Sequence, residues 1–401
     1  MINLELPKKI KNAESMAHQM AASVFRPIAR KYDTIEHCDT PKELIPMGQM
    51  LAAGAAAGQL GSGGSGSGGD VKNGGNMQAI VGTTEMAWGC CGLMLSLPGM
   101  GLGNAAISAV GSPEQKEKFG KLYCAMAITE PNCGSDSAAV QTTAELDGDE
   151  WVLNGEKIFA TAADRGDAVV VWATLDKSIG KAAIKSFLVE KGTPGMSVVR
   201  VEDKLGLRVS DTAALLFDNC RIPKENIMGD PEIADTEAAR KKAFGGVMQT
   251  FDNTRPQVAA MALGVARAAL ELALELLEKE QVKPEYDKSF FNSTALEAEL
   301  YKMEANLEAS RLLTLKAAWM ADNKIPNSKE ASMCKAKAGR VANAVTLRCV
   351  EICGTLGYSE NNLLEKFARD SKILDIFEGT QQIQQLIVAR HVLGKSSKDL
   401  K

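Results

Sequence analysis

Hydrophobic and polar positions divide the 401-residue chain into three zones of different periodicity. In the first zone, apolar residues recur every three or four positions from Ile10 to Ile28, and residues 77–96 form a second, largely apolar run. Both patterns are typical of helices, because residues three and four apart share one helix face. We therefore expect an N-terminal α-helical domain over residues 1–123.

Short β-rich runs separated by turn residues fill the middle zone. Three of them have the length and composition of strands: AVVVWAT at 168–174, IKSFLV at 184–189 and MSVVRV at 196–201. The dipeptide Asn154-Gly155 suits a tight hairpin turn, because both residues tolerate positive φ. The zone over residues 124–235 is therefore expected to form a small antiparallel barrel or sandwich.

Helical periodicity returns in the last zone, over residues 236–401. Four helices are expected, beginning with a long one: residues 261–274, 294–321, 332–352 and 381–393. Long helices joined by short connections favour a bundle. The order of zones is helical, β and helical, which predicts an α+β multidomain protein.

The glycine-rich segments do not predict a dinucleotide-binding site. Residues 61–69 read GSGGSGSGG inside a Gly/Ser-rich stretch at 53–76, whose composition indicates a flexible surface excursion of the first domain. The spacings Gly61-x-Gly63-x-x-Gly66 and Gly101-x-Gly103-x-x-Ala106 match a dinucleotide fingerprint. Neither has the preceding strand and the later acidic residue that such a site requires, so a Rossmann fold is rejected.

Composition excludes several classes of protein. The 46 basic and 50 acidic residues give no cationic surplus, which argues against general nucleic-acid binding. The chain contains no run of about 18 apolar residues and begins without the apolar core of a secretory signal, so no membrane span is expected. Nine cysteines without a C-x-x-C pair, and only three histidines, predict neither a metal site nor a disulfide framework. A reducing compartment is expected.

The segment MAITEPNCGSD at 126–136 is the first candidate for chemistry. Thr129 and Ser135, together with Thr161 further along the chain, place hydroxyl groups beside predicted strands. Such a loop can offer N–H and O–H donors to the polar edge of a flat ligand. A capped turn is the alternative, because the proline, asparagine and glycine of the loop would by themselves explain a bend.

The segment RDSKILDIFEGTQQIQQLIVAR at 369–390 is the second candidate. Glu378 follows two apolar residues and precedes a glycine, just before the last predicted helix. If this carboxylate is partly desolvated, its pKa rises towards the range in which a general base works best. From composition alone, a solvated glutamate at a helix start is the more common arrangement.

At these two segments the chain strongly resembles the acyl-CoA dehydrogenases, flavoenzymes that oxidise acyl-CoA thioesters to trans-2-enoyl-CoA. ITEPNCGSD and ILDIFEGTQQIQQLIVAR look like the two signature regions of that family, and three intervening segments also fit: 207–212, 217–227 and 252–256. The likeness covers residues from about 80 to 395 in the same order. It implies an N-terminal α domain, a middle antiparallel β barrel, a C-terminal four-helix bundle and FAD as the cofactor.

The resemblance also assigns residues to the cofactor and the substrate. Residues 126–135 look like the strand and loop beside the flavin ring, Thr129 and Thr161 like its hydrogen-bonding partners, and Phe159 like the aromatic residue that flanks it. The implied FAD contacts are Met126, Ile128, Thr129, Gly134, Ser135, Phe159, Thr161, Lys283, Glu351, Gly354, Gly379, Thr380 and Gln382. The implied contacts with acyl-CoA are Ser135, Ser210, Asp252, Arg255, Phe377, Gly379 and Arg390.

Glu378 matches the catalytic base of the family. Some members keep the base on the long bundle helix instead, near Thr254, but here that position is a threonine. In the family, the backbone N–H of the base and a flavin hydroxyl stabilise the enolate oxygen while hydride passes from Cβ to the flavin. The resemblance further implies an electron-transfer flavoprotein as partner and a homo-oligomer, either a dimer or a homotetramer, that serves β-oxidation.

Two segments depart from the pattern of the family. Where many relatives carry Arg-x-x-Phe-Gly, which reaches the FAD of a neighbouring subunit, this chain reads Lys283-Pro-Glu-Tyr-Asp, and Thr294 replaces a glutamine. Glu351 and Thr355 stand where glutamine and glycine are common in the second such segment, next to Gly354. Because lysine keeps the charge of arginine but loses its bidentate fork, we expect FAD affinity or subunit arrangement to differ.

Three alternatives share these motifs. An acyl-CoA oxidase or an enoyl-CoA reductase would use the same scaffold and the same residues. A flavin-poor subunit of a hetero-oligomeric dehydrogenase would explain the altered segments between subunits. The start of the chain fits a bacterial cytoplasmic protein, and a processed chain of the mitochondrial matrix would look similar.

Overall fold

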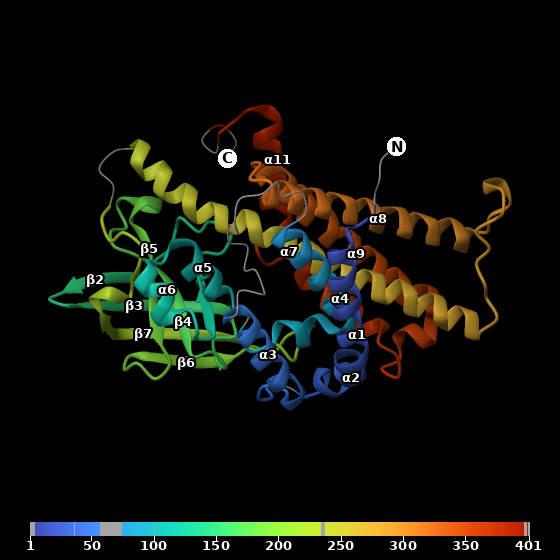
Figure 1. Ribbon diagram of the computed structural model, residues 1–401, viewed down its shortest axis with the longest axis horizontal. Helices are drawn as coiled ribbons and strands as arrows, with labels where there is room; N and C mark the ends of the chain where they lie inside the picture. The colour runs from blue at the N-terminus through green and yellow to red at the C-terminus, as the bar shows by residue number, and fades with distance from the viewer. Residues whose placement is uncertain are drawn as a thin grey trace.

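The structure is a computed structural model that describes residues 5–35, 37–56, 74–99, 101–233, 237–396 and 399, without the side chains of 51–56, 237–253 and 290. The strands gather at one end and the bundle helices at the other, and α7 (Glu237–Lys279) runs from beside the sheet into the bundle (Figure 1). The expected helical, β and helical order is confirmed. Most of the predicted Gly/Ser-rich excursion at 53–76 lies outside the described residues.

Six α-helices are described before the sheet: α1 (Lys8–Met20), α2 (Arg26–Asp33), α3 (Ile45–Ala56), α4 (Gly75–Leu95), α5 (Leu102–Val110) and α6 (Pro113–Phe119). One π-helical turn, Ala21–Phe25, joins α1 to α2, so the apolar periodicity from Ile10 to Ile28 spans one continuous segment. Gly101 and Gly103 begin α5, where an added Cβ would lie 2.0 and 2.3 Å from carbonyl oxygens of the first strand. These glycines therefore serve close packing, not a dinucleotide.

Asp322 of the bundle fixes the start of α4. Its carboxylate accepts hydrogen bonds from the main-chain N–H groups of Gly74, Asn76 and Met77 at 2.8, 2.8 and 3.0 Å. These N–H groups have no partner within the helix, so the distant carboxylate takes the place of a local cap. The contact also ties the N-terminal helices to the bundle.

Eight strands form one sheet: β1 (Cys124–Ala127), β2 (Thr143–Asp147), β3 (Glu150–Thr161), β4 (Ala168–Thr174), β5 (Ile184–Glu190), β6 (Met196–Val201), β7 (Thr212–Pro223) and β8 (Ile227–Met228). Their order is β6-β7-β3-β2-β4-β5-β8, with β1 beside β4. Most pairs are antiparallel as expected, but β4 pairs in parallel with both β1 and β2. Within the described residues β6 and β8 do not pair with each other.

The predicted hairpin turn at Asn154-Gly155 is wrong. Strands β2 and β3 pair from Asp147 to Glu150, so the turn between them is Gly148-Asp149. Asn154 and Gly155 lie inside β3, where the register against β7 shifts. The positive φ tolerance of Gly155 serves a bulge, with φ at 148°, and not a chain reversal.

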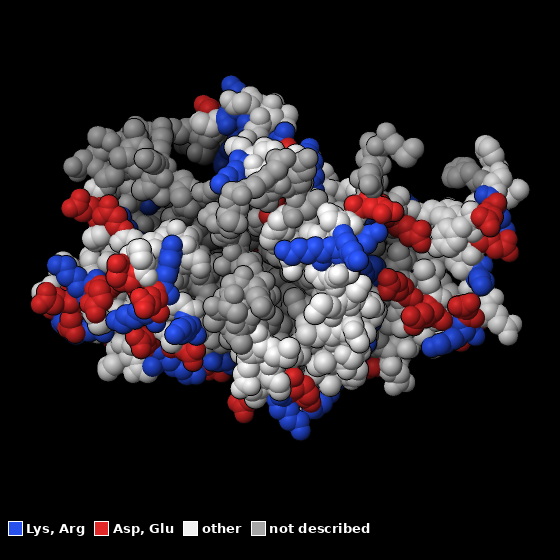
Figure 2. All heavy atoms as spheres, in the orientation of Figure 1, with Lys and Arg blue, Asp and Glu red and all other residues white. Residues whose placement is uncertain are grey.

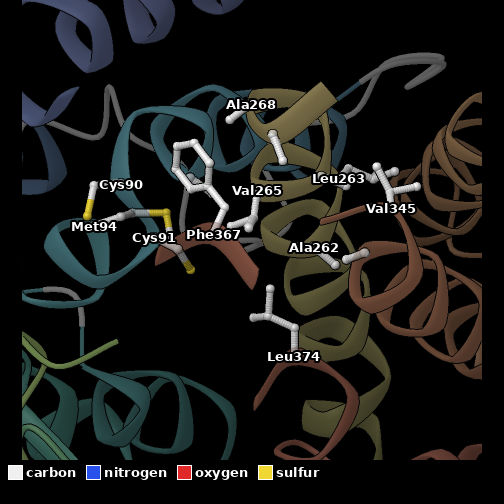
Figure 3. Close-up of a cluster of buried hydrophobic side chains, with 14 of the residues drawn as sticks. Cys90, Cys91, Met94, Ala262, Leu263, Val265, Ala268, Val345, Phe367 and Leu374 are labelled. Carbon is white, nitrogen blue, oxygen red and sulfur yellow. The ribbon is translucent and has the colours of Figure 1, made fainter. Parts of the chain in front are cut away.

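The bundle contains α7 and four later helices: α8 (Ala295–Asp322), α9 (Ser328–Tyr358), α10 (Leu364–Ser371) and α11 (Gln381–Leu393). Its main core contains Cys90 and Met94 of α4, Leu263 of α7 and Phe367 of α10 (Figure 3). Leu207, from the connection between β6 and β7, also belongs to it, so the core joins all three zones. The four predicted helices are confirmed, with the short α10 in addition. Helix α10, which leads into the segment around Glu378, is therefore packed on the largest core.

The surface carries both signs of charge. Lysine and arginine are interspersed with aspartate and glutamate over the sheet and the bundle on the face in Figure 2. None of the described helices is long and apolar enough to cross a bilayer.

Candidate active site

Glu378 and Gly379 form an unusual turn just before α11. The 3₁₀ turn Lys372–Asp375 precedes it, and Thr380 caps α11 with its side chain. Both residues have left-handed backbone, with φ at 55° for Glu378 and 91° for Gly379. A non-glycine residue pays about 1–2 kcal/mol for this conformation, so its surroundings must hold it there.

Gln384 on α11 is one of the groups that hold this turn. Its side chain is fully buried, and Nε2 donates to the carbonyl oxygens of Glu378 at 3.0 Å and Gly379 at 3.2 Å. An added Cβ on Gly379 would lie 2.4 Å from the same amide nitrogen. Gly379 is therefore required both by its φ and by this close approach.

The Glu378 carboxylate is half-buried and hydrogen-bonded. Thr254 of α7 donates its hydroxyl proton to Oε2 at 3.1 Å. Burial raises the pKa of Glu378 above the ordinary carboxyl value, although the Thr254 hydrogen bond and the nearby charges of Arg255 and Lys335 act to lower it. The main-chain N–H of Glu378 makes no hydrogen bond within the described residues. A ligand here would meet a carboxylate of raised basicity and a free donor from one residue.

The loop after β1 and the end of β3 form the second part of the site. The N–H of Ile158 donates to the carbonyl of Thr129 at 2.8 Å, which places Phe159 beside the loop. Phe159 has a positive φ of 57° and an exposed fraction of 59%. The hydroxyls of Thr129 and Thr161 make no hydrogen bond within the described residues. An exposed aromatic face beside unpaired donors suits a flat ring with a polar edge, as in a flavin.

Glu130 and Lys157 position this loop, and the sequence did not identify either of them. Both are buried, and their side chains pair at 2.7 Å. The Glu130 carboxylate also accepts the main-chain N–H groups of Gln141 and Thr142, and Lys157 donates to the carbonyl of Ile128. The available signal was a glutamate inside the conspicuous ITEP segment and a lysine inside a strand.

The turn between β6 and β7 connects the two parts of the site. The carbonyl of Asp211 accepts the N–H of Ala162, immediately after Thr161. The N–H of Leu207 donates to the Asp370 carboxylate at 2.7 Å, which links the same turn to α10. Glu378 follows α10 by a few residues. The β6–β7 turn therefore contacts both the end of β3, near Thr161, and the helix that leads into the turn at Glu378 and Gly379, which we call the acidic turn.

The remaining predicted contacts differ in exposure. Met126, Ile128, Phe377, Thr380 and Arg390 are half-buried, Gly134, Ser135 and Gln382 are exposed, and Ser210 and Arg255 are buried. Arg255 lies close enough to Glu378 to lower its pKa, whereas Phe377 packs against the main core. The side chain of Asp252 lies outside the described residues.

Lys283, Glu351 and Gly354 lie apart from this site. Lys335, whose charge acts on Glu378, precedes Gly354 by nineteen residues of the same helix, about 28 Å at 1.5 Å per residue. Glu351 is exposed and pairs with Arg348, and Lys283 pairs with Glu278. Within one chain, neither Gly354 nor the nearby Glu351 can contact the same small ring as Glu378.

Comparisons with known proteins cover nearly the whole chain. Models of the N-terminal, middle and C-terminal domains of acyl-CoA dehydrogenases match residues 8–126, 125–220 and 244–393. A mitochondrial short-chain specific acyl-CoA dehydrogenase of Bos taurus is 35% identical over 401 residues, covering 98% of this chain and 92% of that protein. An acryloyl-CoA reductase (NADH) of Anaerotignum propionicum is 32% identical, covering 98% and 97%.

Solved structures give the same result for the fold. Butyryl-CoA dehydrogenase from Megasphaera elsdenii is 31% identical with a TM-score of 0.83, covering 98% of this chain and all of that chain. A chain of a structure described as an electron transferring flavoprotein of Acidaminococcus fermentans is 32% identical, also with a TM-score of 0.83 and the same coverage.

Proposed function

The chain belongs to the acyl-CoA dehydrogenase family, and from this premise we propose that it oxidises a short-chain acyl-CoA to the trans-2-enoyl-CoA with Glu378 as the base. It is an oxidoreductase that acts on a CH–CH group. The short acyl chain is proposed because the curated and solved relatives described above act on short-chain and butyryl-CoA substrates. One observation supports the role of Glu378: its carboxylate lies half-buried just before α11, and burial raises its pKa.

The residue environment supports proton removal from Cα of the thioester. A carboxylate whose pKa lies above the ordinary value is a stronger base and gains more from accepting a proton. Thr254 holds one carboxylate oxygen, which leaves the other to face the substrate. The unpaired N–H of Glu378 is suited to the thioester oxygen, where negative charge develops as the proton leaves.

FAD fits the second part of the site. Thr129 and Thr161 would bind the polar edge of its ring, with Met126, Ile128, Gly134 and Ser135 along the loop and Phe159 against a face. Thr380 and Gln382 would close the acidic turn over it. FAD, when bound, supplies the hydride acceptor, so that a proton lost from Cα and a hydride lost from Cβ leave a double bond.

A second copy of the chain would complete the FAD site in this proposal. Lys283, Glu351 and Gly354 are exposed, Lys283 beyond the end of α7 and the other two near the end of α9, so they would meet FAD only in a neighbouring subunit. We therefore propose a homo-oligomer, with an electron-transfer flavoprotein as the acceptor of electrons. The relative in the structure described as an electron transferring flavoprotein supports that partner.

Anaerobic mixing with butyryl-CoA tests the proposal. The purified protein should be yellow and should bleach, and Glu378→Gln should retain FAD but lose at least about 10³-fold in the rate of bleaching. Glu117→Gln, at an exposed glutamate of α6, should bleach at the wild-type rate. Flavin that no acyl-CoA reduces would exclude the dehydrogenase function.

The reverse reaction is the second candidate, because one relative is an acryloyl-CoA reductase that uses NADH. The same residues would then deliver a proton to Cα. Reduction of acryloyl-CoA by NADH in the presence of the protein, faster than oxidation of butyryl-CoA, would favour this direction. Oxygen consumption during turnover would instead indicate an oxidase.

A further inference from the structure

Three lysine side chains are fully buried among the described residues, and one differs from the others. Lys157 pairs with Glu130, and Lys366 pairs with Asp370. Lys335 of α9 has no carboxylate within ion-pair distance in the described part of the chain. Its ammonium donates instead to the carbonyl oxygen of Gly379, at 2.7 Å.

An unpaired buried ammonium is unfavourable for folding. Burial lowers the pKa of Lys335 to about 8, although the charges of Asp375 and Glu378 act to raise it. A hydrophobic side chain of similar length would avoid this desolvation and would usually be neutral or stabilising at such a position. Stability therefore does not explain a lysine here, whereas it does explain Lys157 and Lys366, each with its own carboxylate.

The geometry of the acidic turn provides the explanation. Gln384 donates to the carbonyls of Glu378 and Gly379, and Lys335 donates to the second of these from the opposite helix. Together the two side chains fix the peptide groups on either side of Gly379. The orientation of these groups sets φ and ψ of Gly379 and ψ of Glu378, the two left-handed residues of the turn.

We infer that Lys335 is a positioning residue for the base: by holding the Gly379 carbonyl from α9, it fixes the turn from which Glu378 presents its carboxylate and N–H to one substrate. The inference rests on the proposed function, because it needs Glu378 to be the base. The positive charge of Lys335 also favours the ionised, reactive form of that carboxylate. Lys335 itself contacts the turn and not the reacting atoms.

Lys335→Met tests the inference, with butyryl-CoA as the probe in anaerobic stopped-flow reduction of the flavoprotein. Misplacement of a reacting group by about 1 Å costs about 100-fold in rate, so the limiting rate constant should fall by at least about that factor. The half-saturating butyryl-CoA concentration should change less than about 3-fold. The melting temperature should stay level or rise, because a desolvated charge is removed and Gln384 still donates to the Gly379 carbonyl.

Isotopic substitution separates positioning from a general loss of structure. If Lys335→Met misplaces the base, removal of the Cα proton becomes slower relative to other steps. The kinetic isotope effect with α-deuterated butyryl-CoA should therefore increase over the wild type. Lys366→Met is the matched control, since it also replaces a fully buried lysine. It should lower the melting temperature, because Asp370 loses its partner. Lys185→Met is the control for the rate: the Lys185 ammonium on β5 also donates to main-chain carbonyls, those of Asp230 and Glu232, and its loss should leave the rate constant and the isotope effect unchanged.

Two outcomes would overturn the inference. A wild-type reduction rate in Lys335→Met would show that the lysine does not position the base. Failure of both Lys335→Met and Lys335→Gln to accumulate as folded flavoprotein would show that the lysine is needed for structure. Glu378→Gln, measured in parallel, keeps the two proposals apart. If that variant still reduces flavin at the wild-type rate, the proposed base is wrong whatever Lys335 does.

Discussion

At the scale of single residues, the surroundings of Glu378 decide its chemistry. The carboxylate receives one hydrogen bond, from Thr254, and lies near the cations of Arg255 and Lys335. All three act to lower its pKa, yet burial outweighs them and the pKa is raised. The balance between desolvation and these partners therefore sets the pKa of the base.

Thr254→Val should move the pH dependence of flavin reduction. The carboxylate is the reactive form, so the rate rises with pH through the pKa of Glu378. The valine removes a hydrogen bond that lowers this pKa, and the rising limb should therefore shift to higher pH. The measurement is the limiting rate of bleaching by butyryl-CoA against pH. Thr314→Val, at a buried threonine of α8, is the control and should not shift the limb; a shift to lower pH for Thr254→Val would contradict the account.

At the scale of elements, local sequence signals and pairing can compete. Asn154-Gly155 has the composition of a hairpin turn, but β3 continues through it for twelve residues in all, Glu150–Thr161. The chain reverses instead at Gly148-Asp149, where Asp147 and Glu150 pair across the turn. The glycine of the bulge is then needed because Thr142 packs where its Cβ would lie.

Gly155→Ala should destabilise the middle domain by at least about 2 kcal/mol, because an added Cβ would approach Thr142 Oγ1 to 2.5 Å at a φ of 148°. Gly148→Ala is the matched comparison. It also has positive φ, but no atom lies within 4 Å of the added Cβ, so a loss of about 1 kcal/mol is expected. Urea unfolding followed by tryptophan fluorescence would measure both, and equal losses would refute the steric explanation.

At the scale of the whole molecule, ion pairs around the buried Asp33 connect the N-terminal helices to the bundle. Asp33 of α2 binds Arg369 of α10 through both carboxylate oxygens, at 2.6 and 3.1 Å, and also pairs with Arg30. Glu365 binds Arg369 from the same helix and pairs with Arg30. Because α10 leads directly into the acidic turn, this cluster helps to fix the base relative to the first domain.

Asp33→Asn should lower the stability of the molecule by about 2 kcal/mol at pH 7, since the hydrogen bonds of two half-buried arginines to a charged acceptor are weakened. Burial raises the pKa of Asp33, but the Arg369 hydrogen bond and the nearby cations outweigh it and hold the pKa below 3.8. The stabilisation is therefore complete well above the unfolded-state pKa, from about pH 5, and is lost as the pH falls through the depressed pKa. Urea midpoints at pH 7 and pH 3 measure this. The exposed control Asp39→Asn should change neither midpoint, and a difference for Asp33→Asn that grows in acid would contradict the sign.

The amino-acid sequence was sufficient to predict the order of the three zones, the four long C-terminal helices and the two segments that carry the candidate site. These features depend on periodicity and on short motifs, which are local properties of the chain. The motif around Glu378 was also enough to suggest a base. Composition alone favoured a solvated glutamate, because burial is not visible in a local pattern.

Only the tertiary structure determined what surrounds that glutamate. Thr254, Lys335 and Gln384 converge on one turn from three helices, and their separation in sequence gives no sign of it. The parallel pairings of β4 and the bulge at Gly155 likewise depend on which strands meet. The pKa of Glu378 depends on desolvation and on its distance from other charges. The left-handed turn and the burial of Lys335 depend on which helices pack together. None of these properties is defined before the chain has folded.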